Sequence, residues 1–218
     1  MRVISTLIIF LALPGIALAQ GSRANSWEWS FAALYQDSER LGSEGGSSLN
    51  VDGDYGIGVN IGYNFSDHLT LGVDLDWLSP DYRAVLVDDT VSPAETVTID
   101  HEFSQFNGRI KGTYTFLDGP LKPFVEAGLG WTYIDSNVAD GPPITGCWWH
   151  PWWGYICSNY YSTFSNTSFT YGAGLGLRYD LRGGSFIKLG YNVWELDDAG
   201  SAGSGTISAA RLEYGWTF

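Results

Sequence analysis

YGIGVNIGYNFSDHLTLGVDLDW, residues 55–77, alternates apolar residues with glycine or polar residues on both sides of a break at Ser66-Asp67-His68. Strict period-2 alternation places successive side chains on opposite faces of a β-strand. The stretch therefore predicts two antiparallel strands joined by a tight turn. One face of this pair is aliphatic and aromatic, and the other is glycine, asparagine and aspartate.

The same alternation recurs in eight runs, each about as long as a tilted strand that crosses hydrocarbon. The runs are 27–36, 55–65, 69–77, 105–116, 125–133, 169–180, 187–194 and 211–218. Tight turns at 66–68, 117–120 and 182–184 alternate with long segments near 37–54, 79–104, 135–165 and 196–205. This organisation predicts an all-β fold, an eight-stranded antiparallel transmembrane up-and-down β-barrel with both chain ends on the short-turn side.

Two pieces of the second long segment also have strand character. Residues 83–87 and 96–100 are interpreted as strand extensions beyond the membrane, because acidic residues and an arginine interrupt their apolar band. A further hairpin is the alternative. A soluble β-sandwich is disfavoured for the whole chain, because its outer face would carry many charges, whereas the polar face here is rich in glycine.

The N-terminal residues 1–19 have the three parts of a cleaved signal peptide. Arg2 precedes an apolar run from Val3 to Leu13, and Ala17-Leu18-Ala19 forms a small-residue cleavage site before Gln20. The apolar run is shorter than the roughly 20 residues that a membrane-spanning helix needs. We therefore expect export through the inner membrane and a barrel domain over residues 20–218.

The composition agrees with export into a membrane. The aromatic fraction is 16%, with 10 Trp and 13 Tyr, which suits aromatic girdles at two membrane interfaces. The formal net charge of −13 argues against nucleic acid as a partner, because that binding depends on Lys and Arg.

The last strand ends in Leu212-x-Tyr214-x-Trp216-x-Phe218. With the eightfold alternation and the short and long connections, the chain resembles small outer-membrane barrels, either the OmpA/OmpX-type membrane domain or the OmpW-like family. The resemblance implies a place in the outer membrane of the Gram-negative cell envelope, in contact with outer-membrane lipid and lipopolysaccharide. It also implies that Leu212, Tyr214, Trp216 and Phe218 form a signal for the outer-membrane assembly machinery. No cofactor is expected.

Charged residues occupy the polar, inward face of the predicted strands. They are Glu28, Asp74, Asp76, Arg109, Lys111, Glu126, Arg178, Asp180, Lys188, Arg211 and Glu213. Side chains fill the interior of an eight-stranded barrel, and buried charges there must pair. We expect a salt-bridged network that closes the lumen. The alternative is a narrow channel or conduit for ions or small molecules, for which the inward glycines leave room.

The segment Cys147–Cys157 is the most distinctive in the chain. Two cysteines this close in an exported protein predict a disulfide. Between them lie Trp148, Trp149, His150, Trp152, Trp153 and Tyr155. These aromatics either pack against the barrel rim or lipopolysaccharide, or they form an exposed surface-binding loop. A metal site is not expected, because it would need reduced cysteines and further ligands.

Catalysis has little support in the sequence. The histidines are His68, His101 and His150, and the contiguous set His101, Glu102 and Ser104 matches no catalytic pattern of lipid A-modifying enzymes. We therefore expect a non-enzymatic barrel with a structural and surface-interaction role. The acidic loop residues are solvated or bind divalent cations; they are Asp37, Glu39, Glu44, Asp88, Asp89, Asp140, Asp197 and Asp198.

Overall fold

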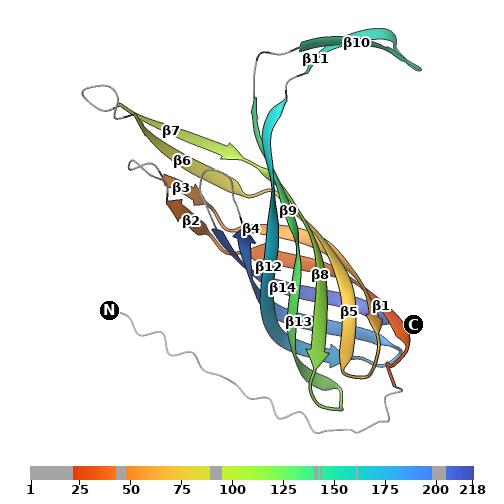
Figure 1. Ribbon diagram of the computed structural model, residues 1–218. Coiled ribbons are helices and arrows are strands. Elements are labelled where there is room, and N and C mark those ends of the chain that lie inside the picture. The colour runs from red at the N-terminus through yellow and green to blue at the C-terminus, as the bar shows by residue number, and fades with distance from the viewer. Residues whose placement is uncertain are drawn as a thin grey trace.

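The computed structural model describes residues 22–42, 48–88, 95–139, 142, 144–160, 162–197 and 205–218. These residues form fourteen β-strands and no helix (Figure 1). None of them belongs to a helix long and apolar enough to cross a membrane.

Eight of the strands close into one antiparallel barrel, in the order β1-β14-β13-β12-β9-β8-β5-β4. Their bounds are β1 Ser26–Gln36, β4 Asp54–Asn64, β5 Leu69–Leu78, β8 Ser104–Thr115, β9 Leu121–Ala139, β12 Thr163–Asp180, β13 Ser185–Asp197 and β14 Gly205–Thr217. The predicted eight-stranded antiparallel barrel is confirmed. The quoted stretch forms β4 and β5, with Gly62 paired to Gly72.

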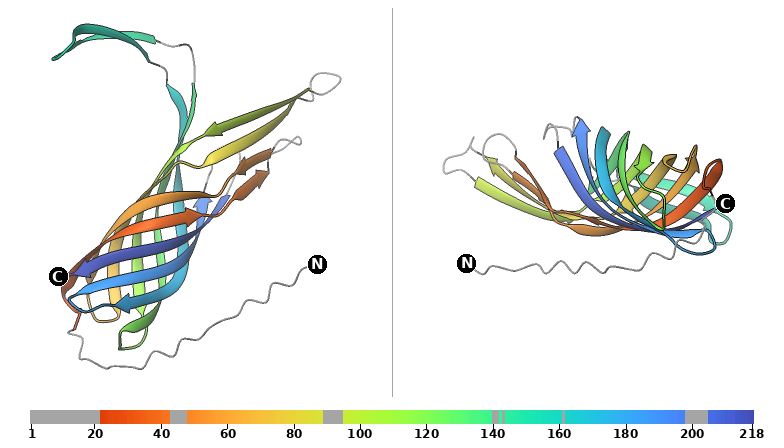
Figure 2. Two further views of the ribbon diagram at one scale, coloured as in Figure 1. Left: turned by 180° about the vertical axis from the view of Figure 1, so that it is seen from behind. Right: turned by 90° about the horizontal axis from the view of Figure 1, so that it is seen from below.

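The two ends of the described chain meet and close the barrel. β1 pairs with β14 along its length (Figure 2), and Trp27 and Phe218 exchange two backbone hydrogen bonds of 2.8 Å. The C-terminus lies at the end of the barrel that carries the tight turns (Figure 1), and Trp27 pairs there with Tyr63, close to the turn at 66–68. We call this end the short-turn end, and the opposite end the long-hairpin end.

Burial along the barrel strands is the reverse of that in a soluble protein. In β4 the apolar side chain of Ile57 is 68% exposed, whereas the polar side chain of Asn60 is 2% exposed. The outer surface is therefore apolar, as contact with lipid requires, and the polar side chains face a filled interior.

The long connections carry strands of their own, and the sequence pattern indicates strand character only in residues 83–87 and 96–100 of them. β2 (Glu39–Gly42), β3 (Ser48–Val51), β6 (Asp81–Asp88) and β7 (Glu95–Glu102) form a four-stranded sheet outside the barrel (Figure 1). β6 and β7 contain residues 83–87 and 96–100, so these pieces extend beyond the barrel and also pair as a hairpin. The break between β5 and β6 falls at Pro80, which has no N–H to donate and accepts a bond from the Phe103 N–H at 3.1 Å.

A third hairpin consists of β10 (Ile144–His150) and β11 (Gly154–Tyr160), which pair only with each other among the described strands. It lies beyond the ends of β9 and β12, away from the barrel (Figure 1). The predicted signal peptide, residues 1–19, lies outside the described residues, as do the acidic residues Glu44, Asp89, Asp140 and Asp198.

Candidate functional site

The lumen at the short-turn end is filled by charges that pair across strands. Glu28 on β1 receives Lys188 Nζ at 2.8 Å and Arg178 Nη1 at 2.7 Å. Arg178 also donates to Asp180 at 2.6 Å, and Lys122 lies 2.9 Å from the other oxygen of that carboxylate. Glu28 is fully buried, so its charge depends on these two cations.

A second cluster crosses the middle of the lumen. Lys111 on β8 places Nζ 2.8 Å from Asp74, 3.2 Å from Glu126 and 3.6 Å from Glu213. Asp74 and Glu126 are on the strands next to β8, but Glu213 is on β14, at the opposite side of the ring of strands. One ammonium group thus joins two facing walls of the barrel.

Two arginines extend this middle cluster. Arg211 Nη1 lies 2.5 Å from Asp76 Oδ1, and Arg211 Nε donates to Glu213 at 2.8 Å. Arg109 Nη1 lies 3.1 Å from Asp76 Oδ2. The guanidinium of Arg109 also stacks over the ring of Trp194, 4.4 Å from its centroid. Trp194 is on β13, so this contact also crosses the lumen.

The structure places all eleven charged residues of the predicted network inside the barrel, each in at least one ion pair. They are Glu28, Asp74, Asp76, Arg109, Lys111, Glu126, Arg178, Asp180, Lys188, Arg211 and Glu213. The sequence reasoning missed two further cations, Lys122 and Arg23. Lys122 could have been found, because it has the same strand parity as Glu126. Arg23 precedes β1 and carries no periodic signal; its Nη1 lies 4.0 Å from Glu28.

Apolar side chains also occupy the inner face. At the long-hairpin half they are Leu34, Leu78, Trp194 and Leu196, all buried. Nearer the short-turn end, the Phe186 ring lies under the Arg178 guanidinium, 3.8 Å from its carbon. Aromatic side chains therefore lie among the paired charges of the lumen, and buried aliphatic side chains are added at its long-hairpin half.

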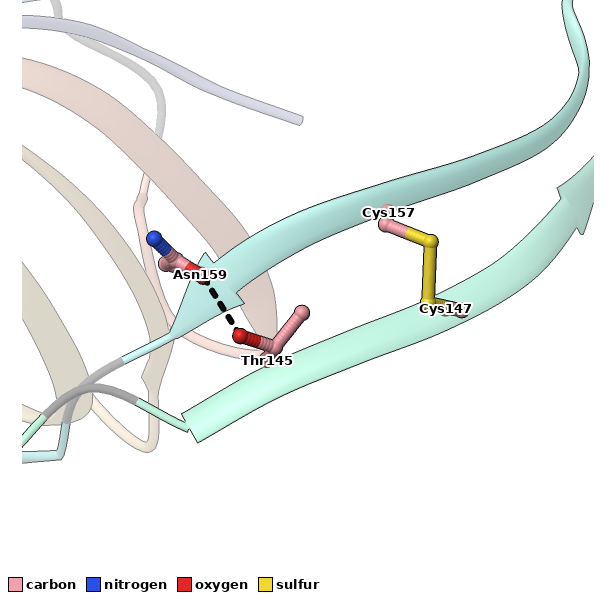
Figure 3. The surroundings of a disulfide bond; sticks show 4 residues. All are labelled: Thr145, Cys147, Cys157 and Asn159. Atoms are coloured by element: carbon pink, nitrogen blue, oxygen red, sulfur yellow. Dashed lines mark hydrogen bonds between the residues drawn. A yellow bond between two sulfur atoms is a disulfide. The ribbon is translucent and has the colours of Figure 1, made fainter.

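The disulfide predicted between Cys147 and Cys157 is present and joins directly paired residues of β10 and β11 (Figure 3). Thr145 and Asn159 pair at a position two residues closer to the barrel than the disulfide. The Thr145 Oγ1 hydroxyl donates to Asn159 Oδ1 at 2.8 Å, on the same face of the hairpin (Figure 3). These two links lie on one side of the tip and fix its base.

Aromatic side chains at the tip of this hairpin are exposed. The exposed fractions are 69% for Trp149, 83% for Trp152, 73% for Trp153 and 70% for Tyr155. His150 packs its ring 4.3 Å from that of Trp153 and accepts the backbone N–H of Trp152 at 3.2 Å. These side chains are therefore exposed and do not pack on the barrel rim.

The residues considered for catalysis make local contacts in the described part of the chain. His101 is in β7, where its ring stacks on Tyr82 and its Nδ1 contacts the backbone of Glu102. Ser104 begins β8 and pairs with Asp135. His68 contacts the carbonyl oxygen of Thr115 at 2.9 Å in a tight turn.

The acidic residues Asp37, Glu39, Asp88 and Asp197 fall in the described ranges. Within those ranges no group of three or more His, Cys, Asp and Glu side chains could hold a metal ion. Asp37 accepts a hydrogen bond from the Tyr191 hydroxyl at 2.7 Å. Binding of divalent cations at these loops stays a prediction.

The residues predicted to form an assembly signal face outward, from Leu212 in the middle of β14 to Phe218 at the short-turn end. Leu212, Tyr214 and Phe218 are 51%, 44% and 72% exposed. Trp216 stacks on Trp29 of the neighbouring strand, with ring centroids 5.0 Å apart.

Known proteins share this architecture. A family model for the outer membrane protein beta-barrel domain matches residues 7–218. The crystal structure of the outer membrane protein OprG from Pseudomonas aeruginosa has a TM-score of 0.57 and 14% identity, over 91% of this chain and 98% of that chain. Ail, the attachment invasion locus protein of Yersinia pestis, solved with the heparin analogue sucrose octasulfate, has a TM-score of 0.50 and 13% identity, over 89% and 99%.

Neisserial surface protein A has a TM-score of 0.49 and 16% identity, over 91% of this chain and 98% of that chain. At these identities OprG and Ail share the fold alone with this chain. No curated protein matches the sequence at a significant level.

Proposed function

The chain belongs to the outer membrane protein β-barrel domain family, and we propose that it is a non-enzymatic barrel with a closed lumen that presents the β10–β11 hairpin for contacts at the cell surface. The barrel is then a rigid scaffold in the outer membrane. Its partner-binding surface lies outside the lumen.

The observation that carries the closed lumen is the position of Lys111. Its ammonium group contacts carboxylates from both facing walls, including Asp74 at 2.8 Å and Glu213 at 3.6 Å. An eight-stranded barrel has room for little beyond its own side chains. A permeating ion would have to separate these pairs, and an unpaired buried charge is strongly unfavourable.

The hairpin supports the surface role. Clusters of exposed Trp and Tyr side chains are typical of binding hot spots, and the disulfide links the two strands that carry this cluster. Ail is solved with a sulfated sugar, but the long connections of this chain are rich in acidic residues. Like charges would repel a polyanion here, so we propose a partner without strong negative charge.

Single-channel recording in planar lipid bilayers tests the closed lumen. The full-length protein is refolded, its folding is verified by different gel mobility before and after boiling, and it is inserted under an applied voltage. We expect no stable discrete conductance. Regular openings from correctly folded protein would favour the narrow channel or conduit instead.

Lipid A analysis tests the non-enzymatic part. Cells that carry the protein are expected to have the same lipid A mass profile as cells without it. A changed profile that reverts with His101→Ala would identify a lipid A-modifying enzyme and overturn this part of the proposal.

A further inference from the structure

We propose that the β10–β11 hairpin inserts its aromatic tip into the headgroup region of an opposing zwitterionic phospholipid bilayer. This inference rests on the surface role proposed above and names the partner of that same hairpin. Four properties of the hairpin support it: charge, the distribution of its aromatics over both faces, length and rigidity.

The first property is charge. Residues 141–177 contain no Asp, Glu, Lys or Arg. The long segments 37–54 and 79–104 contain five and six acidic residues, each with one arginine. The hairpin is thus an uncharged projection from an acidic surface. It fits an uncharged or zwitterionic partner. Because the hairpin has no Asp, Glu, Lys or Arg side chain, its insertion into a lipid interface carries no free-energy cost for removing such a charge from water.

The second property is the distribution of aromatics around the tip. Directly paired residues share a face, so Trp149 and Tyr155 lie on the face of the disulfide. Trp148 lies on the other face and is 38% exposed. Trp152 and Trp153 form the turn between the strands. A tip immersed in lipid headgroups meets lipid on every side, and aromatics on both faces and in the turn suit that environment.

Tryptophan and tyrosine suit this environment chemically. Their rings are largely apolar but carry one hydrogen-bonding group, and both residues are enriched where hydrocarbon meets water. The ionisable residues between the two cysteines are His150 and Tyr155. His150 is packed against Trp153 within the tip.

The third property is length. From Cys147 to Pro151 the chain advances four residues, which corresponds to about 13 Å of extended strand. Peripheral elements enter a bilayer to a depth of about 5–10 Å. The part of the hairpin beyond the disulfide is therefore long enough to enter the interface, while the disulfide remains outside.

The fourth property is rigidity. An isolated two-stranded hairpin is marginally stable in water, and β10 and β11 pair only with each other among the described strands. The disulfide and the bond from Thr145 to Asn159 hold the strands together. The aromatic tip is thereby ordered before it meets a membrane, which lowers the entropy cost of binding.

Vesicle binding by the full-length protein provides the test. The protein is held in lipid nanodiscs, so that no detergent is present, and is mixed with large phosphatidylcholine vesicles that are then sedimented. We expect binding with a blue shift of tryptophan emission, unchanged by 0.5 M NaCl. Vesicles containing phosphatidylserine should bind more weakly, because the acidic segments repel them.

The test variant is Trp149→Ser/Trp152→Ser/Trp153→Ser, whose barrel is checked by its heat-dependent gel mobility. We expect its affinity for phosphatidylcholine vesicles to fall at least tenfold. The matched control, Thr145→Ala, changes the base of the same hairpin and should retain binding as long as the disulfide is intact. Reduction of the disulfide should weaken binding without unfolding the barrel.

The inference is overturned if the native protein does not bind phosphatidylcholine vesicles, or if the triple variant binds them equally well. Two further assays separate this failure from failure of the surface role: binding to immobilised neutral polysaccharide and self-association measured by light scattering. If either depends on the same three tryptophans, the hairpin contacts sugars or a second copy, and the surface role stands. If the variant equals the native protein in all three assays, both proposals fail.

Discussion

Lys111 Nζ lies 3.6 Å from Glu213 Oε1, although β8 and β14 are on opposite sides of the ring of eight strands. The other oxygen of Glu213 receives a hydrogen bond from Ser30 at 2.7 Å, and Asp74 and Glu126 hold the ammonium group from the near side. This contact fixes the distance between two walls that no backbone hydrogen bond connects. The same ion pair therefore closes the lumen and stabilises the folded barrel.

Replacement of Lys111 by methionine should destabilise the barrel. Methionine approximates the length of the lysine stem but leaves three buried carboxylates without their shared cation. Removal of one partner from a buried ion pair typically costs about 3–5 kcal/mol. The midpoint of urea unfolding of the refolded protein in lipid vesicles should fall accordingly.

The control for this variant is Arg83→Gln, which removes an ion pair with Asp100 on the exposed sheet outside the barrel. Both side chains are more than 60% exposed, and such pairs contribute little. Its unfolding midpoint should match that of the native protein. Equal midpoints for all three proteins would show that the lumen network does not stabilise the fold.

Gly130→Ala should impair the barrel, whereas Gly112→Ala should be tolerated. A Cβ at Gly130 would lie 2.0 Å from the carbonyl oxygen of Gly108, so the backbone of β8 would have to move. At Gly112 the nearest atom would be 4.0 Å away. Forced overpacking costs typically 1–3 kcal/mol. Refolding yield and thermal unfolding should separate the two variants, and identical behaviour would contradict the close approach of β8 and β9.

Phe218→Ala should leave the stability of the purified barrel nearly unchanged but lower its amount in the outer membrane of cells. The ring is 72% exposed, and β1 is held by the backbone of Phe218, which alanine preserves. An assembly signal read by other proteins depends on the side chain. Comparison of refolded stability with the yield from outer-membrane fractions tests this. Normal assembly in cells would argue against the signal.

Asp67 ties the start of the described chain to a tight turn. Partial burial by itself would raise the pKa of this carboxyl, but the backbone N–H groups of Arg23 and Ala24 and the Ser22 hydroxyl donate to it and lower its pKa below the ordinary value. A lowered pKa means that the tether is intact above about pH 4 and is lost as the pH falls further.

The amide resonance of Arg23 in the refolded protein reports this titration. Its chemical shift should change with a midpoint below the ordinary aspartate value of about 3.9. In Asp67→Asn the change should disappear. A midpoint at or above the ordinary value would contradict the tether.

Much of the barrel could be predicted from single segments of sequence. The period of two in residues 55–65 is a local property, because lipid faces one side of every strand and a filled interior faces the other. Short and long connections then order the strands. The same parity places Glu28, Arg178 and Lys188 on the inner face, and it also covers Lys122, which was overlooked because the apolar run begins after Pro123.

The sheet and the hairpin beyond the barrel were only partly foreseen. Residues 39–51 are rich in glycine, serine and charged residues, so they show no clear alternation, yet residues 39–42 and 48–51 pair as β2 and β3 beside β6. Partners from distant segments supply the hydrogen bonds that local preference does not. The disulfide followed from the spacing of two cysteines in an exported chain, but the exposure of the aromatics around it did not.

The number of barrel strands, their inner and outer faces and the charges that point inward can be predicted from the chain, because alternation is local to each strand and recurs along the sequence. Which of those charges meet depends on the closed barrel. Lys111 reaches Glu213, and Arg109 stacks on Trp194, because closure of the sheet and its stagger bring opposite walls together. That stagger is a property of the whole ring, and no single strand encodes it.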